Sequence, residues 1–463
     1  MPGRHFAVTW SIPDNFGGMT TALLQRSRAF VRLGGASVDI LTFEPRADYP
    51  LREAALRDSG ELIDGTRLLN LYEWLRRNPL PGGSLRPQQH PFTPLPDDGE
   101  STLIRTRQGP DGTILQVDHY RCDGTLLLTD RRDTRERGVI GGRSIVLCDA
   151  AGVPVRSWGR IHHLYAAWLD RLTDRQPSSM IVDSKTIAGF MLHYRRAHVT
   201  TVHVVHASHR GRDGVRASRR DVFENLDRFD VVVVLTDGQR HDVRHDLGRA
   251  GRVRVIPNAT SVDVRGDDER DPRSGVVLAS LTPRKRVAHA MRAAAMAGAT
   301  LDVYGDGELR GELTKLADEL GDVRLHGYRA DAREEFTRAS FLLATGRSEG
   351  FPLALIEGMA AGCIPIAYDV PYGPADLIDG VNGILVPSGN QAALAAAIEK
   401  LIAETPAQLA RRRRHARRTA QRYTDAVITE RWARELRAAW RRKRRAGVVR
   451  RVRAGAKVLR RAS

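Results

Sequence analysis

Cysteine is scarce in this chain. Among 463 residues there are three cysteines, Cys122, Cys148 and Cys363, and they lie far apart in the sequence. A disulfide framework needs paired cysteines, and a cysteine metal site needs ligands at short spacing. The sequence therefore predicts a fold that uses neither, which is typical of the reducing cytoplasm.

Long apolar runs are missing as well. Residues 1–20 include Arg4, His5 and Asp14, and no uninterrupted apolar stretch of about 18 residues occurs in the sequence. A secretion signal and a membrane-spanning helix both need an apolar core. We therefore expect a cytoplasmic protein, for which peripheral contact with the inner face of a membrane remains open.

Acidic residues are scarce only near the C-terminal end of the sequence. From Thr405 to Ser463 there are 21 lysines and arginines but three acids, and subtracting these from the totals of 73 and 55 leaves 52 of each in residues 1–404. The net charge of +18 thus belongs to the C-terminal segment. Three interpretations fit such a segment: it binds an anionic membrane surface, it binds a polyphosphate polymer, or it is a disordered run of charges that is simply solvated. Nucleic acid is not expected, because no interleaved aromatic residues or DNA-binding motif accompany the basic run.

The chain begins with an alternation of strand and helix patterns, and its length suggests two to four domains. Residues Phe6–Ser11 predict a strand, Gly17 and Gly18 follow it, and a helical pattern comes next. A strand, a glycine turn and a helix can hold a phosphate, because glycine lets the backbone approach an anion closely. An ordinary tight turn is the alternative.

Further elements follow in the same half. The apolar patterns predict strands at 37–43, 180–183, 200–205, 231–235 and 253–258, and helices at 67–76, 160–174 and 185–196. Residues 79–97 contain six prolines and predict a surface loop. Residues 101–157 hold short strand-like runs separated by Asp-Gly and Gly-Gly turns, which predicts an antiparallel insertion.

Three histidines, His203, His206 and His209, surround the end of the strand at 200–205. Zinc binding is one interpretation, but no fourth ligand and no HExxH or CxxC spacing accompanies them. A structural role for each is another.

The strand and helix pattern restarts after residues 260–274, a hydrophilic span that predicts an interdomain link. We expect strands at 275–280, 301–304 and 323–328, and helices at 286–297, 308–320, 391–404, 406–423 and 424–444. Trp432, Leu436, Ala439 and Trp440 recur at helical spacing, which suits packing on another domain.

The most informative stretch is Arg347–Pro387. It follows the apolar run Phe341–Ala344, which predicts a buried strand, and passes through a Gly-Phe-Pro turn into a short apolar helix. A ligand here would meet the end of a strand and the start of a helix, where free N–H groups favour an anion such as a diphosphate. Glu349 and Glu357 flank the turn, and two solvated glutamates near a helix start are the alternative.

This E-x7-E spacing, with the Gly-Phe-Pro turn and the small residues Gly358, Ala360 and Gly362 after it, resembles the donor site of the family 4 retaining glycosyltransferases. The resemblance covers nearly all of residues 1–445 and implies the α/β GT-B architecture, two Rossmann-like domains facing a cleft. We expect an acceptor-side domain at 1–258 with a β insertion at about 100–158, a nucleotide-sugar domain at 259–424, and a crossover helix with an arginine-rich tail at 425–463.

The resemblance also implies roles for individual residues. Glu349 and His209 would contact the donor sugar, with His206 as the second choice, and Lys285 would pair with the donor diphosphate. The donor-binding residues would be Gly17, Gly18, Arg284, Gly305, Gly350, Phe351, Pro352, Leu353 and Glu357, the last on the ribose. Neither a metal ion nor a cofactor is expected.

One position departs from the family pattern. Ser280 stands where the family usually carries an arginine. A charged contact to a buried phosphate is worth about 1.5–3 kcal/mol. We therefore expect Arg284 or Arg286 to replace the missing arginine; otherwise the active site would be degraded.

The segment Ala367–Ile378 resembles one branch of family 4, the wall teichoic acid glycosyltransferases, which glycosylate polyol-phosphate polymers and carry comparable β insertions. The implied reaction is retaining transfer of a hexose or N-acetylhexosamine from a nucleotide sugar, UDP-linked, to a teichoic-acid-like polymer. A membrane glycolipid or capsule acceptor, and a catalytically weak scaffold that binds anionic polymer, are the alternatives. Homo-oligomer formation remains open.

Overall fold

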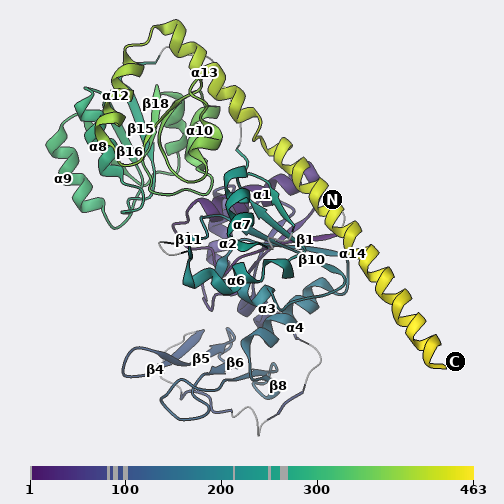
Figure 1. Ribbon diagram of the computed structural model, residues 1–463. Helices are drawn as coiled ribbons and strands as arrows, with labels where there is room; N and C mark the ends of the chain where they lie inside the picture. Colours follow the sequence, from purple (N-terminus) through teal and green to yellow (C-terminus); the bar gives the residue numbers. More distant parts are fainter. Residues whose placement is uncertain are drawn as a thin grey trace. The chain divides into compact units, whose positions relative to one another are not determined.

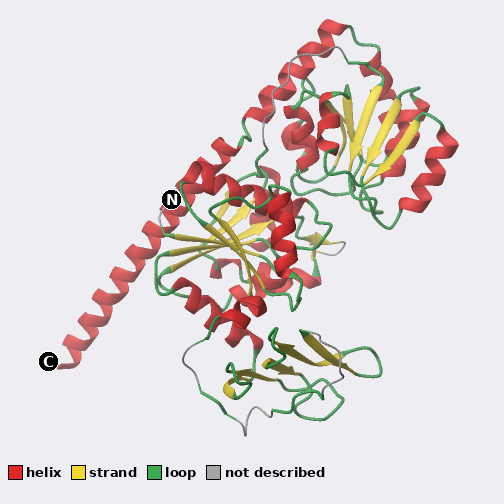
Figure 2. Ribbon diagram, turned by 180° about the vertical axis from the view of Figure 1, so that it is seen from behind, coloured by secondary structure: helices red, strands yellow, loops and turns green. Residues whose placement is uncertain are grey.

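The fold was examined in a computed structural model of the chain (Figure 1; Figure 2 shows it from behind). The structure describes residues 3–80, 84–86, 92–96, 103–211, 214–248, 252–260 and 270–462, and the side chains of these residues except at 211, 214 and 447–462. The chain forms two compact units, one of residues 15–35 and 202–463 and the other of residues 2–14 and 36–201.

The first sheet has seven strands in the order β14-β13-β10-β9-β1-β2-β3. The strands are β1 (Arg4–Val8), β2 (Val38–Thr42), β3 (Thr66–Asn70), β9 (Ser178–Val182), β10 (Val199–Val205), β13 (Val231–Val234) and β14 (Val253–Val255). Its helices are α1 (Gly18–Gly34), α2 (Tyr49–Asp58), α3 (Leu71–Arg77), α4 (Ile161–Thr173), α5 (Lys185–Met191), α6 (Arg220–Glu224) and α7 (Asp237–Leu247). The apolar runs at 231–234 and 199–205 are buried along their whole length, as parallel strands covered on both faces require.

The second sheet has six strands in the order β17-β16-β15-β18-β19-β20, and all of its strand pairs are parallel. The strands are β15 (Ser274–Leu278), β16 (Thr300–Tyr304), β17 (Val323–Gly327), β18 (Phe341–Ala344), β19 (Ile364–Asp369) and β20 (Ile384–Pro387). The helices are α8 (Val287–Met296), α9 (Arg310–Leu320), α10 (Leu353–Ala360), α11 (Pro374–Leu377), α12 (Gln391–Ile402), α13 (Pro406–Gln421) and α14 (Asp425–Ala462). One apolar core joins this sheet to α8, α9, α12 and α13.

The antiparallel insertion that the sequence predicted is present. Five strands pair in chain order, β4 (Ile104–Gln108), β5 (Ile114–Tyr120), β6 (Leu126–Arg131), β7 (Ser144–Cys148) and β8 (Pro154–Trp158), and every pair is antiparallel. Leu127, Leu128, Ile145 and Val146 of β6 and β7 are fully buried.

Three predicted helices differ from the structure. The helix predicted at 185–196 ends already at Met191. The helix predicted at 67–76 is wrong in its first half: residues 66–70 form β3, because they pair with β2 along its length. The helix begins only at Leu71, where the side chain of Asn70 accepts hydrogen bonds from the N–H groups of Tyr72 and Glu73. The last helix, predicted to end at 444, continues to Ala462.

Two predicted connections are only partly visible. Residues 261–269 of the predicted interdomain link lie outside the described residues. In the predicted proline-rich loop, the described residues 84–86 and 92–96 belong to no helix or strand. None of the helices in the described part of the chain has the length and apolar content needed to cross a bilayer.

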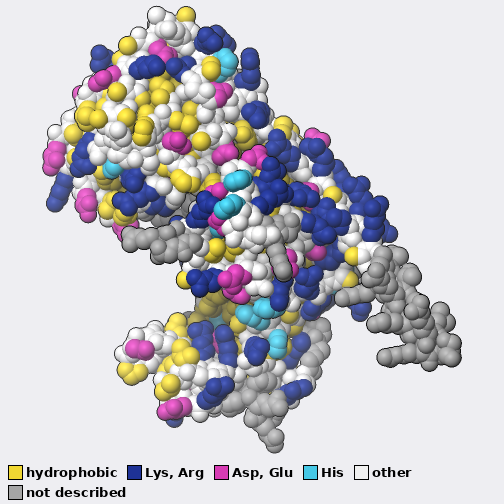
Figure 3. All heavy atoms as spheres, in the orientation of Figure 1, with side chains coloured by type: hydrophobic (Ala, Val, Ile, Leu, Met, Phe, Trp, Pro, Cys, Tyr) yellow, Lys and Arg dark blue, Asp and Glu magenta, His cyan; other side chains and the backbone are white. Residues whose placement is uncertain are grey.

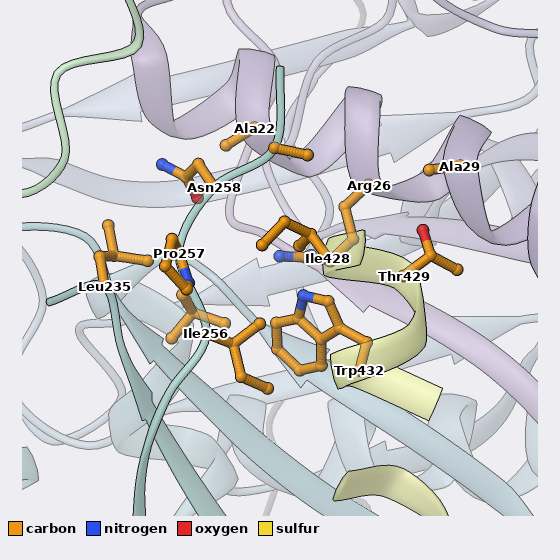
Figure 4. A pocket seen from close by; sticks show the side chains of 12 residues that line it. Ala22, Arg26, Ala29, Leu235, Ile256, Pro257, Asn258, Ile428, Thr429 and Trp432 are labelled. Carbon is orange, nitrogen blue, oxygen red and sulfur yellow. The ribbon is translucent and has the colours of Figure 1, made fainter. Parts of the chain in front are cut away.

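The predicted apolar stripe of the last helix packs on α1. Trp432, Leu436 and Ala439 are buried, and Trp440 is half-buried. The Trp432 indole meets the Phe30 ring edge-on at 6.1 Å, and the guanidinium of Arg26 lies 5.3 Å from its centre. Figure 4 shows Trp432 beside Ile256 and Ile428 in a small pocket along this contact, which none of the predicted site residues lines.

Replacing Trp432 with alanine tests how much this contact stabilises the fold. We expect Trp432→Ala to lower the midpoint of thermal unfolding by several degrees, because truncating a buried tryptophan costs about 3–5 kcal/mol. Arg437→Ala is the control, since Arg437 is exposed on the same helix and its loss should cost about 0.5 kcal/mol or less. Equal unfolding midpoints for the two variants in scanning calorimetry would show that the apolar stripe contributes little to the stability of the fold.

Candidate active site

Glu349 and Lys285 form an ion pair where two neighbouring strands end. Glu349 lies on the loop after β18, and Lys285 on the loop after β15, which pairs with β18. The Lys285 Nζ atom lies 2.6 Å from Glu349 Oε1, and the two side chains are 21% and 13% exposed. The two loops therefore present one positive and one negative group at the same edge of the sheet, where open α/β sheets bind ligands.

Hydrogen bonds hold these two loops to each other. The Thr345 hydroxyl donates to the carbonyl oxygens of Lys285 and Arg286, both at 3.0 Å. The backbone N–H of Arg347 donates to the carbonyl of Arg284 at 2.8 Å. The position of Lys285 relative to Glu349 is therefore set by the backbone as well as by the ion pair.

The geometry distinguishes the two candidates for the arginine missing at Ser280. Arg284 donates from its side chain to the Ser348 carbonyl at 2.9 Å and lies 3.7 Å from Glu349 Oε1. Arg286 instead donates to the Ser388 hydroxyl at 3.2 Å, beyond β20. Arg284 is therefore the arginine beside the Lys285 and Glu349 pair.

Glu357 lies in α10, one helical turn beyond its start, and is 14% exposed. Its carboxylate lies 3.1 Å from the Nε atom of Arg333, which belongs to the short helix at 332–337. Arg333 could not be recognised from the sequence, because a partner 24 positions away from Glu357 leaves no local pattern.

The starts of α1 and α10 lie close together. Neither helix has a side chain that caps its first turn, so backbone N–H groups are free to bind an anion at both. A methyl group on Gly18 would lie 3.6 Å from the side chain of Leu353, the first residue of α10. Gly17 and Gly18 are exposed, whereas Phe351, Pro352 and Leu353 are buried. Together these residues form the surroundings that a diphosphate would need.

At two positions of the predicted site, another part of the backbone lies so close that only glycine fits. A methyl group at Gly350 would collide with the carbonyl oxygen of His206. Gly305 follows β16 with φ +148°, and a methyl group there would collide with the carbonyl oxygen of Ala279. The N–H of Gly305 also donates to the Gly327 carbonyl at 2.8 Å. Gly305 therefore holds the C-terminal ends of β15, β16 and β17 close to one another.

His209 is fully buried and does not lie against Glu349 in any contact that the structure records. Its Nε2 atom lies 2.8 Å from Asp246 Oδ2, its ring lies 5.4 Å from that of Phe223, and its Nδ1 atom has no hydrogen-bond partner among the described residues. The Arg210 guanidinium holds the pKa of Asp246 well below its usual range, so this carboxylate stays ionised. A charged acceptor on Nε2 favours the tautomer that carries its proton there.

The other two histidines take different positions. His206 contributes its carbonyl to the contact with Gly350, and His203 stacks on Phe229 with ring centres 5.2 Å apart. In the described part of the chain, no group of three or more histidine, cysteine or acidic side chains is arranged to hold a metal.

Tyr372 is a residue of this region to which the sequence assigned no role. Its hydroxyl donates to Asp242 Oδ2 of α7 at 2.7 Å, and Asp242 also binds Arg210 at 2.5 Å. Burial and the bond to Asp242 raise the pKa of Tyr372. The residue has φ +68°, an unusual backbone conformation for tyrosine. The segment Ala367–Ile378 thus places a strained tyrosine against α7, close to the Asp246 that holds His209.

Replacing Gly350 with alanine tests the approach to His206. We expect Gly350→Ala to lower the melting temperature by several degrees, because the added methyl group must displace either the 346–352 loop or the His206 carbonyl. Gly311→Ala is the matched control: a methyl group there meets nothing within 4 Å inside α9, so the melting temperature should stay or rise. A Gly350→Ala variant that melts like the control would contradict the close approach.

Parts of the chain are similar to several known proteins. Residues 275–404 match the family described as glycosyl transferases group 1. An exopolysaccharide phosphotransferase of Streptomyces coelicolor is 35% identical over 215 residues, 44% of this chain, but the chain spans only 23% of that relative's length. A poly(glycerol-phosphate) alpha-glucosyltransferase of Bacillus subtilis is 23% identical over 93% of this chain and 74% of its own length.

A solved structure gives the fold of the whole chain. Staphylococcus aureus TarM, crystallised with fondaparinux, alpha-GlcNAc-glycerol and UDP, superposes with a TM-score of 0.79 over 94% of this chain and all of the other, at 18% identity. At that identity the likeness establishes the fold, which is GT-B with two Rossmann-like domains. The family match covers residues 275–404, which resemble the glycosyl transferases group 1 domain.

Proposed function

We propose that this chain is a retaining glycosyltransferase of family 4 that moves a hexose or N-acetylhexosamine from a UDP-linked donor to a hydroxyl of a polyol-phosphate, teichoic-acid-like polymer. The observation that carries the proposal is the ion pair of Lys285 and Glu349 beside the start of α10, inside the segment that matches the glycosyltransferase family. The name of the Bacillus subtilis relative supports the polymer, and the UDP bound to TarM supports the nucleotide.

The positive groups of the site suit the leaving diphosphate. Lys285 and Arg284 supply two cations, and the starts of α1 and α10 supply backbone N–H groups. Such fixed groups stabilise the charge that develops on the leaving oxygen as the bond from sugar C1 to phosphate breaks. We therefore propose that neither a metal ion nor a cofactor is needed.

The remaining residues would orient the substrates. Glu349 would hold the donor sugar, Glu357 the ribose hydroxyls, and His209 a sugar hydroxyl through Nδ1, with its other nitrogen fixed by Asp246. The acceptor oxygen then bonds to sugar C1 as the diphosphate leaves. The proton of the acceptor hydroxyl passes to the departing phosphate, so the step needs no protein base.

Two alternatives differ in acceptor or in activity. A glycolipid or capsule acceptor at the membrane uses the same donor site. A catalytically weak scaffold is favoured only by Ser280, and the position of Arg284 beside Glu349 argues against it. A cytoplasmic location stays a prediction, and peripheral contact with the inner face of a membrane and homo-oligomer formation stay open.

The decisive test is an assay of transfer from UDP-glucose or UDP-N-acetylglucosamine to a glycerol-phosphate polymer. The release of UDP is the quantity measured. We expect turnover with one of these donors. Glu349→Gln should lower kcat by about 100-fold or more, because the negative charge of the Glu349 carboxylate acts where the sugar reacts. Glu319→Gln, an exposed glutamate of α9, is the control and should keep full activity.

Two results would contradict the proposal. One is the absence of UDP, GDP or ADP release from any of the corresponding sugar donors, which would favour the scaffold. The other is full activity of Glu349→Gln. Transfer to a glycolipid but not to the polymer would keep the transferase and change the acceptor.

A further inference from the structure

Helix α13 carries a row of arginines on one face. Arg411, Arg414, Arg418 and Arg422 are all exposed, the last just beyond the end of the helix. Their spacing of three, four and four residues keeps them within an arc of about 80°, since an α-helix turns about 100° per residue. The row extends over about 16 Å of helix at the usual rise per residue.

The same spacing recurs on α14. Arg434, Arg437, Arg441 and Arg445 are exposed and again follow one another at three, four and four residues. Figures 1 and 2 show α13 and α14 one after the other along nearly the same line. In Figure 3, lysine and arginine side chains gather along the edge that these helices form. We call these eight residues the arginine row.

The arginine row contributes little to the fold. Among the described residues only Arg434 of the row has an acidic partner, Glu430 at 3.8 Å, and this pair is exposed. Three basic side chains on other faces of the same helices do have acidic partners at 2.6–2.7 Å, namely Arg412 with Glu404, Arg442 with Glu435, and Lys443 with Asp230. The charge of the row is therefore available to an anion outside the chain.

We propose that the arginine row is a binding site for a linear phosphodiester polymer, which lies along α13 and α14. This inference rests on the proposed function, because it names a second contact for the same acceptor. A guanidinium group binds phosphate oxygens in pairs, and a line of such groups suits a line of phosphates. The row then holds the polymer near the enzyme and raises its effective concentration at the active site.

The apolar side chains favour a polymer over a membrane surface. Amphipathic helices that bind membranes bury apolar side chains among the lipids. Among the residues whose side chains the structure describes, none of the large apolar side chains that are exposed lies on α13 or on α14 up to residue 446. Leu409, Ala416 and Ala420 of α13, for example, are all buried. Up to residue 446, these helices therefore expose arginine side chains rather than large apolar ones, which suits a soluble polyanion.

The test removes the α13 half of the row. The full chain with Arg411, Arg414, Arg418 and Arg422 changed to glutamine is compared with a variant that loses the same charge elsewhere. The control changes four exposed arginines that lie outside α13 and α14, namely Arg135, Arg137, Arg171 and Arg292, to glutamine. Binding of fluorescent poly(glycerol phosphate) is followed by anisotropy over a series of salt concentrations.

We expect the row variant to bind the polymer at least tenfold more weakly at low salt. The slope of log affinity against log salt should also become shallower by about 3, because each lost phosphate contact removes about 0.7 for a single-stranded polyanion. The control should stay within twofold of the unchanged chain in affinity. In transfer assays the row variant should show a raised KM for the polymer, with unchanged kcat and unchanged UDP affinity.

Three outcomes are decisive. Equal polymer affinity in the two variants overturns the proposal. A row variant that keeps its polymer affinity but no longer binds phosphatidylglycerol vesicles also overturns it, in favour of a membrane surface. If the unchanged chain turns over no nucleotide sugar, the proposed function is refuted. Loss of polymer binding in the row variant would still support the arginine row as a polymer-binding site in that case.

Discussion

The ion pair between Lys285 and Glu349 is the contact on which the candidate site depends. Their sequence positions are 64 residues apart, and the parallel pairing of β15 with β18 brings the two loops together. Both side chains are mostly buried, and a charge removed from water is costly unless it has a partner. The pair therefore fixes one cation and one carboxylate at the same place, as the proposed contacts with a diphosphate and a sugar require. The hydrogen bonds of Thr345 make that placement a property of the backbone.

Close backbone approach supplies the rest of the site. Gly350 lets the loop before α10 meet the His206 carbonyl, and Gly18 brings the start of α1 near Leu353. Two uncapped helix starts then lie close to each other, and their free N–H groups favour an anion. The contact of α14 with α1 belongs to the same compact unit, so residues from distant parts of the sequence support one site.

The sequence predicted most of the strands and helices, because buried parallel strands and amphipathic helices leave local periodic patterns. The helix predicted at 67–76 failed where pairing with β2 outweighed local preference. The resemblance brought Lys285 and Glu349 together, but only geometry could separate Arg284 from Arg286. The partners of Glu357 and Tyr372 could not be predicted, since contacts between distant residues leave no spacing to recognise.

Calorimetric titration with UDP tests the central claim most directly. The unchanged chain should bind UDP, and Lys285→Ala should weaken binding by about 10- to 150-fold, the equivalent of one charged phosphate contact of about 1.5–3 kcal/mol. Lys315→Ala, which removes an exposed lysine of α9, should bind like the unchanged chain. No binding of UDP, GDP or ADP by the unchanged chain, or equal affinity in the two variants, would contradict a donor diphosphate site at Lys285.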